Sequence, residues 1–298
     1  MTSYTRPQET LRLTQLLGDF RLLLILFISF RLMLMMVYQP MLIDDVERGL
    51  GAQGDRLYHY QLSSLSEDGD LPFRDWWSEF PPVWYFVTTA IYQLQGETVN
   101  YSGWSMALAM FLLVFELGNL WLMRAIGTEL YGANTGMSLA WVYAVTVAPM
   151  VFLFWNFETL VAFFLLLGLY WLIKEKNDRS AVAVALGALT KFTPALLFGA
   201  VIRFRDPKKA ARYIAIAVGL FVLAYLPLFA QNAEMTLPSL TAQFNKASYQ
   251  TVWALIDGNY ITGNFGTVQS HFDPEAANEL YGEPAVIPSF VRLAVAGA

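Results

Sequence analysis

The chain has no cysteine and few charged residues for its length. With 298 residues and no cysteine, it can form neither disulfide bonds nor thiolate metal sites. Only 14% of the residues are charged and 56% are hydrophobic, with a mean hydropathy of +0.43. Soluble domains contain roughly 25% charged and 45–50% apolar residues. This composition argues against a water-soluble fold and favours a membrane protein.

Motifs of several other protein classes are missing as well. The sequence contains no glycine-rich phosphate loop, no dinucleotide fingerprint and no Ser-His-Asp set. His59 and His271 are too few and too separated for a zinc site, and we expect each to be a hydrogen-bonding loop residue. The net charge is -5 and no basic stripe is large enough to bind nucleic acid.

The sequence does contain a series of long apolar runs. A helix that crosses a bilayer needs about 20 apolar residues, with a range of roughly 17–25. No polar linker divides the runs, so we expect one polytopic, all-α membrane domain over residues 1–298. A further run begins at 288–298, which predicts additional C-terminal helices that this chain lacks. The runs of spanning length are 22–38, 103–123, 135–155, 157–173 and 211–229.

Two other apolar segments are not expected to cross the bilayer. Residues 83–94 follow the prolines at 81–82 and are too short to span, so we expect an interfacial helix that begins at proline. Residues 181–202 are interrupted by Lys191 and Pro194. Proline breaks a helix, and a lysine at depth needs a polar cavity. We therefore expect two half-helices that enter and return on one side, as a re-entrant hairpin.

The distribution of charge predicts the orientation. Lysine and arginine accumulate in cytoplasmic loops, and basic clusters flank the hairpin at 174–179 and 203–212. With the hairpin and the interfacial helix left out of the count, residues 1–21 form a cytoplasmic tail. The acidic loops 39–102 and 230–287 then lie outside. All basic loops fall on one side of the membrane and both acidic loops on the other.

Within the apolar runs, two lone charges need partners. Arg31 and Glu116 are expected at similar depths, because they lie nine and seven residues from the cytoplasmic ends of their runs. An unpaired charge near the bilayer centre costs about 2.5–3.5 kcal/mol. An ion pair between them inside the bundle is therefore one expectation. The alternative is that the Arg31 side chain reaches the membrane surface while Glu116 bonds to Asn119 or is protonated.

Loop 39–102 contains three short motifs in a fixed order. Asp-Arg-Leu-Tyr-His-Tyr at 55–60 precedes Gly-Asp-Leu-Pro-Phe-Arg-Asp at 69–75 and Glu-Phe-Pro-Pro at 79–82. This order resembles the GT-C superfamily of glycosyltransferases and is most similar to glycosyltransferase family 87 and related bacterial mannosyltransferases. Ala-Leu-Thr-Lys at 188–191 also resembles a stretch of that superfamily.

The resemblance implies a GT-C-like helical bundle with a large first extracytoplasmic loop that carries interfacial helices. It also implies an inverting transferase that moves mannose or a similar hexose from a polyprenyl-phosphate donor. The acceptor would be a glycan, lipid or protein on the extracytoplasmic face of a bacterial or archaeal plasma membrane, and membrane lipids would be the other partners. Nucleic acid would not be one.

Several carboxylates are candidates for the catalytic chemistry. A loop carboxylate can act as general base when it lies within hydrogen-bond reach of the acceptor hydroxyl. Asp55 is the first candidate, and Asp44 and Asp45 are the alternatives, since they lie closer to the first helix. Glu158 resembles a second acidic position that binds a metal or the acceptor, although a carboxylate resting among lipid headgroups explains it equally. Carboxylates could bind Mg²⁺ or Mn²⁺, but no spacing demands a metal, and no metal ligand is assigned.

Other residues are candidates for binding. A cation facing the lipid phosphate would stabilise the charge that grows on the leaving group, and Lys191 and Arg74 are the candidates. For Arg74, a salt bridge with Asp70 or Asp75 at the rim is an equal alternative. Side chains of loop 39–102 would contact the sugar or acceptor, and the candidates are Tyr58, Tyr60, Asp75, Trp76 and Glu79.

The aromatic residues of this loop have two explanations. Trp84, Tyr85 and Tyr92 are expected to form an aromatic belt at the membrane surface. Trp76 and Trp77 sit amid carboxylates and could equally line a site.

A transporter or lipid flippase is the competing function. Its substrate would bind near the bilayer midplane at the broken hairpin. This alternative explains the hairpin but not the large acidic loop.

Overall fold

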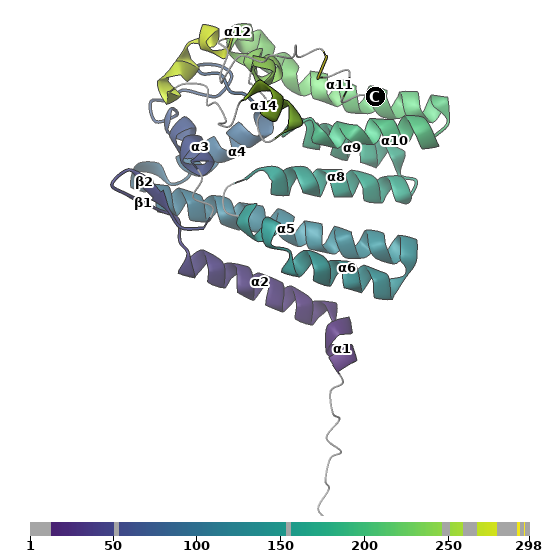
Figure 1. Ribbon diagram of the computed structural model, residues 1–298. Helices are drawn as coiled ribbons and strands as arrows, with labels where there is room; N and C mark the ends of the chain where they lie inside the picture. Colours follow the sequence, from purple (N-terminus) through teal and green to yellow (C-terminus); the bar gives the residue numbers. More distant parts are fainter. Residues whose placement is uncertain are drawn as a thin grey trace, which may run out of the picture.

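The fold is mostly helical in the part of the chain that the structure describes. The computed structural model describes residues 13–50, 54–152, 156–245, 251–258, 267–278, 291–292 and 295. The long helices lie side by side, and loop 39–102 and the short helices after α11 gather at one end of them (Figure 1). The long helices are α2 (Phe20–Val37), α5 (Tyr101–Tyr131), α6 (Ala133–Val145), α8 (Glu158–Ile173), α9 (Asn177–Ala188) and α11 (Pro207–Gln231).

Shorter elements complete the described chain. The helices are α1 (Leu13–Gly18), α3 (Asp55–Ser64), α4 (Pro82–Gln93), α7 (Val147–Phe152), α10 (Leu197–Phe204), α12 (Ala233–Thr236), α13 (Pro238–Thr241) and α14 (Val252–Asp257). The 3-10 helices are η1 (Gly96–Thr98), η2 (Thr193–Leu196), η3 (Ala242–Asn245), η4 (Val268–Phe272) and η5 (Pro274–Asn278). Two strands, β1 (Met41–Ile43) and β2 (Val46–Arg48), form an antiparallel pair.

In the described ranges, α2, α5 and α11 are long and apolar enough to cross a membrane. Polar side chains cap the starts of α2 and α5: Asp19 accepts from the N–H of Arg21 at 2.8 Å, and Asn100 accepts from the N–H of Gly103 at 2.9 Å. Large apolar side chains stay exposed along these helices, as a surface facing lipid requires. Examples are Ile25, Phe30, Met33, Met110, Val114, Val222 and Leu223.

The expected span at 135–155 differs from the structure. Helix α6 ends at Val145, Thr146 is extended, and α7 starts at Val147. The physical reason is Pro149, which has no N–H for the carbonyl of Val145 and whose ring would clash with that carbonyl in a continuous helix. The apolar run is therefore split into two helices, and its last residues, 153–155, lie outside the described part.

The break expected between residues 181 and 202 is present. Helix α9 ends at Ala188, and a 3-10 turn containing Pro194 leads into α10. Nη2 of Arg205, just after α10, donates to the carbonyl of Leu172 near the end of α8 at 2.5 Å. The two half-helices therefore return to the level at which they began.

A short β-hairpin corrects the all-α expectation. Ile43 pairs with Val46, which leaves Asp44 and Asp45 as a two-residue turn with φ of 50° and 59°. Positive φ at both central residues is the signature of a type I′ turn, which Asp tolerates better than most residues. The Asp44-Asp45 pair thus has a structural role at the tip of this hairpin, and both side chains are exposed.

The expected aromatic belt is wrong. Trp84 and Tyr85 have 0% exposure and Tyr92 has 4%, because α4 packs against α3 and α5 instead of lying open at a surface. Trp76 and Trp77 are also fully buried. Trp76, Trp84, Tyr85 and Tyr92 belong to the main hydrophobic core, and Trp77 packs with Ala242, Ala276 and Ala277, so none of the five can serve as a surface belt.

The expected ion pair inside the bundle is not formed directly. Arg31 and Glu116 are both described and both 1% exposed. Glu116 Oε2 instead accepts a hydrogen bond from the hydroxyl of Tyr143 at 2.6 Å. The guanidinium of Arg31 lies over the ring of Phe27, 3.3 Å from its centroid. Arg31 acts on Glu116 only through space.

Candidate functional site

Lys191 lies in the break between α9 and α10 and has a carboxylate partner. Its ammonium forms an ion pair with Glu158, the first residue of α8. The same nitrogen lies 5.1 Å from the ring centroid of Phe157 and 5.8 Å from that of Phe80. Both members of the pair are about one-third exposed, at 34% each. The lysine and glutamate chosen from separate stretches of sequence therefore meet.

The start of α4 docks against this break. The N–H of Val83 donates to the carbonyl of Leu189 at 3.0 Å, and the rings of Phe80 and Phe157 lie 4.9 Å apart. Pro82 occupies the first turn of α4, where its missing N–H costs nothing. The Glu-Phe-Pro-Pro stretch at 79–82 and the stretch around Lys191 are thus in contact.

Asp55 approaches the same region from α3. It is the first residue of α3 and its side chain is exposed. Burial raises the pKa of the Tyr85 hydroxyl well above its ordinary value, and the negative charges of Glu79 and, more weakly, Asp55 raise it further. One turn after Asp55, the ring of His59 lies 6.2 Å from that of Phe157. Helix α3, which Asp55 begins, therefore packs through His59 against Phe157, which also contacts Lys191. We call the Lys191–Glu158 pair, together with Phe157 and the 79–82 stretch, the Lys191 site.

The C-terminal part of the chain covers one side of this cluster. Glu79 Oε2 accepts from Nε2 of Gln243 at 2.6 Å. The hydroxyl of Tyr58 is hydrogen-bonded to Nε2 of His271 at 2.7 Å, and Nδ1 of His271 to the carbonyl of Trp77 at 2.7 Å. His271 is thus a hydrogen-bonding residue as expected.

His59 departs from expectation, because it lies on a helix and not in a loop. It is 4% exposed, and its ring packs edge-on against those of Trp84 and Tyr85. It serves as part of the aromatic core beneath the Lys191 site.

Arg74 and Asp75 form a salt bridge of 2.6 Å at the rim. This salt bridge was one of the two explanations given for Arg74. Nη2 of Arg74 also donates to the carbonyl of Gly69 at 2.8 Å, and Asp75 accepts from the N–H of Leu71 at 2.8 Å. Partial burial would raise the pKa of Asp75, but the hydrogen bonds from Arg74 and Leu71 and the charge of Arg74 lower it overall. These contacts close the 69–76 turn.

Two of the candidate sugar-binding aromatic residues pack against other side chains of the protein. Trp76 is fully buried. The ring of Tyr60 packs against those of Tyr92, Tyr101 and Trp104 at 5.3 to 5.5 Å. Trp76 therefore has no exposed face for a sugar, whereas Tyr60 and Tyr58 are both partly buried, Tyr58 beside His271.

Glu47 and Arg56 position Asp55, although the sequence singled out neither. Nε of Arg56 donates to Glu47 at 2.8 Å and to the hydroxyl of Tyr101 at 2.7 Å. The other oxygen of Glu47 accepts from the N–H of Gly54, the residue before Asp55, at 2.9 Å. The opposite charges at 47 and 56 were the available signal, but their pairing depends on the β-hairpin.

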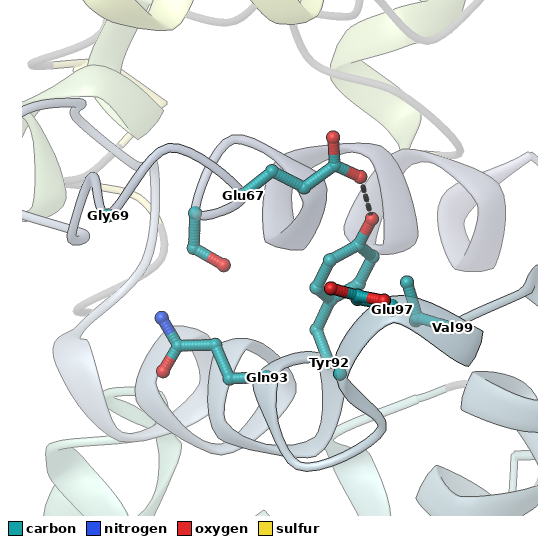
Figure 2. Close-up of a pocket in the computed structure, with 8 residues that line it drawn as sticks. Glu67, Gly69, Tyr92, Gln93, Glu97 and Val99 are labelled. Atoms are coloured by element: carbon teal, nitrogen blue, oxygen red, sulfur yellow. Dashed lines mark hydrogen bonds between the residues drawn. The ribbon is translucent and has the colours of Figure 1, made fainter.

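A concavity lies at the carboxyl-terminal ends of α3 and α4, away from the Lys191 site (Figure 2). It has a volume of about 710 Å³, and Glu67, Tyr92, Gln93 and Glu97 are among its lining residues. Glu67 accepts a hydrogen bond from the Tyr92 hydroxyl, as Figure 2 shows. No candidate site residue chosen from the sequence lines it. Within the described ranges, no group of three or more His, Asp or Glu side chains is placed to hold a metal ion.

The chain matches no protein-family model, no curated protein and no solved structure. Its function must be inferred from the chemistry of these side chains.

Proposed function

We propose that this protein is an integral membrane glycosyltransferase that moves a hexose from a polyprenyl-phosphate donor to an acceptor hydroxyl. The Lys191 site would lie at the extracytoplasmic end of the helices. One observation carries the proposal: Lys191, Glu158 and the Glu-Phe-Pro-Pro stretch come from three separate stretches of sequence and meet at one end of the helices, where α4 packs against the helix that Asp55 begins.

The chemistry of the cluster suits the transfer. The carboxylate of Asp55 would take the proton from the acceptor hydroxyl as its oxygen forms a bond to the anomeric carbon. The bond between that carbon and the phosphate oxygen would break on the opposite face, so the product is inverted. The polyprenyl phosphate would leave with its new negative charge beside the ammonium of Lys191.

Lys191 would need to change partners during this reaction. In the structure Glu158 neutralises it, and both side chains are accessible enough for a phosphate to compete. Surface ion pairs contribute about 0–1 kcal/mol, so displacing Glu158 would cost little. Glu158 would then be free to bind the acceptor or a divalent cation.

A lipid flippase remains the competing proposal, and the broken hairpin with Lys191 favours it. It assigns no role to Asp55 or to the Glu47–Arg56 contacts that hold the start of α3. Uptake or lipid scrambling in vesicles, measured with the same purified protein, separates the two.

The test of the transferase compares Asp55→Asn with Asp45→Asn. Protein in lipid nanodiscs is given radiolabelled polyprenyl-phosphate mannose or glucose, with membranes from a host lacking the protein as acceptor. We expect Asp55→Asn to slow transfer by about 10²–10⁴-fold, as loss of a general base does. Asp45→Asn is the matched control, because asparagine is favoured in its type I′ turn.

Normal transfer by Asp55→Asn together with loss in Asp44→Asn or Asp45→Asn would move the base to the hairpin tip. If the wild-type protein transfers no sugar from either donor but moves lipid in vesicles, the transferase proposal is wrong and the protein is a flippase.

A further inference from the structure

A basic pocket lies at the end of the bundle where α8 finishes and α9 and α11 begin, opposite the Lys191 site (Figure 1). Its volume is about 420 Å³, within the range of roughly 300–1,000 Å³ that is usual for small-molecule pockets. Beside it, Nη2 of Arg212 on α11 donates to Asp178 on α9 at 2.6 Å. This contact holds the starts of the two helices together. The lining consists of residues 175–179, Lys209 and Arg212.

The pocket has an excess of positive charge. Four of its lining residues are basic and two are acidic, which gives the lining a net charge of +2. Arg212 and Lys209 have carboxylate partners at 2.6 and 3.5 Å. The side chains of Lys176 and Arg179 are exposed, and neither has an ion-pair partner in the part of the chain that the structure describes. These two cations are therefore available to an anion.

The first turn of α9 adds backbone donors to the same pocket. Residues 177–179 of this turn line the pocket, and no side chain caps the start of the helix. The first N–H groups of a helix have no acceptor within the helix and favour a negative charge near them. An anionic group bound between Lys176 and Arg179 would also lie close to these donors.

One face of α9 leads from the pocket along the apolar part of the helix. Arg179, Val182 and Leu186 follow one another at spacings of three and four residues, which places them on the same face of a helix. Val182 and Leu186 are 39% and 42% exposed, although both are apolar. A molecule with an anionic head at Arg179 and a hydrocarbon chain would therefore cover both parts of this face.

We propose that this pocket binds the phosphate headgroup of an anionic phospholipid, with an acyl chain lying along Val182 and Leu186. The guanidinium of Arg179 can form two parallel hydrogen bonds to a phosphate, and Lys176 adds a second positive charge. Basic pockets between helices on the cytoplasmic side of a membrane bind such headgroups, and the charge distribution predicts that this end is cytoplasmic. The inference requires only that the helices lie in a bilayer and is independent of the transferase.

The test measures how the full chain in a neutral detergent responds to added lipid. A ligand of the folded state raises the midpoint of thermal unfolding as its concentration increases, and this dependence gives its dissociation constant. We expect dioleoyl phosphatidylglycerol to raise the midpoint. Dioleoyl phosphatidylcholine, which has the same chains but no net charge, should raise it much less. Glycerol 3-phosphate, which has a phosphate but no chains, should leave it unchanged.

Two pairs of substitutions separate this pocket from general attraction to a basic surface. Lys176→Gln with Arg179→Gln should weaken phosphatidylglycerol binding about 25-fold, since each base near an anionic surface contributes about fivefold. Arg203→Gln with Lys208→Gln removes the same charge from exposed positions outside the lining. This matched pair should weaken binding by less than about threefold, because salt screens exposed charges beyond about 8–10 Å. If the first pair does not fold, Arg179→Gln alone should weaken binding about fivefold.

Three results would overturn the proposal. Equal binding of the two phospholipids would mean that the protein takes up lipid without regard to its headgroup. Equal weakening by the two pairs of substitutions would mean that the basic end attracts anions as a whole and not through this pocket. A shift with glycerol 3-phosphate as large as that with phosphatidylglycerol would mean that the ligand is a soluble phosphate ester and not a lipid.

Discussion

At the scale of single residues, Tyr143 lies between the two charged side chains that are buried inside the helices, Glu116 and Arg31. Its hydroxyl contacts the Glu116 carboxylate at 2.6 Å, and its ring stacks with Phe27, 6.4 Å between centroids, while Phe27 supports Arg31. Tyr143 and Phe27 thus mediate between the two buried charges. Nε and Nη2 of Arg31 have no hydrogen-bond partner among the described residues.

We predict that Tyr143, and not Arg31, is the residue most strongly coupled to Glu116. Hydrogen bonds to charged groups contribute about 1.5–3 kcal/mol, so Glu116→Gln and Tyr143→Phe should be non-additive by about 1–2 kcal/mol. Arg31→Met with Glu116→Gln should show a smaller coupling. Thermal unfolding in detergent measures both double-mutant cycles. A larger coupling for the Arg31 cycle would mean that the two charges meet directly in solution.

At the scale of helices, α5 and α6 pack closely against each other at Gly136. A Cβ at Gly136 would lie 2.6 Å from the carbonyl oxygen of Arg124 and 2.7 Å from the nitrogen of Thr128. Both are backbone atoms, which cannot rotate away as a side chain does. Glycine at 136 therefore allows α6 to turn back closely along α5.

We predict that Gly136→Ala destabilises the protein by about 1–3 kcal/mol, as overpacking does. Gly219→Ala is the matched control, because nothing lies within 4 Å of its Cβ. Alanine in a helix interior is favoured over glycine by up to about 1 kcal/mol, so this control should be neutral or stabilising. The midpoint of thermal unfolding in nanodiscs compares them. Equal effects of the two changes would argue against a close α5–α6 contact.

At the scale of the molecule, charge is segregated between the two ends of the helices. Lys174 pairs with Glu129 at 2.5 Å and Arg212 with Asp178 at 2.6 Å, at the end where α5 and α8 finish and α9 and α11 begin. The Lys191 site and loop 39–102 lie at the opposite end (Figure 1). This separation suits a cytoplasmic basic end and an extracytoplasmic acidic end.

We predict that a cysteine at position 68 is labelled by an impermeant reagent in intact cells, and that one at position 209 is labelled only after permeabilisation. Asp68 and Lys209 are both exposed, so lack of labelling would report the membrane and not burial. Labelling at 209 but not at 68 in intact cells would reverse the orientation.

The sequence by itself determined the features that depend on local chemistry. Apolar runs predicted α2, α5 and α11, which are long enough to cross a membrane, whereas the run at 157–173 forms α8, a shorter apolar helix. Pro194 predicted the break after α9, because length, hydropathy and proline act within a few residues. The proline at the start of α4 was predictable for the same reason. The prediction of one span at 135–155 was wrong, because it followed the apolar composition of the run and ignored Pro149, which splits the run into two helices.

Only the tertiary structure decided which side chains meet. Lys191 and Glu158 are 33 positions apart, and the position of α4 against α5 decided that Trp84 and Tyr85 are buried core and not a surface belt. Periodicity shows which side of a helix is apolar but not whether lipid or protein covers it. A cavity beside Asn119 could not be anticipated either, because residues of α5, α6, α7 and α8 line it and the spacing of these helices depends on the packing of the whole chain.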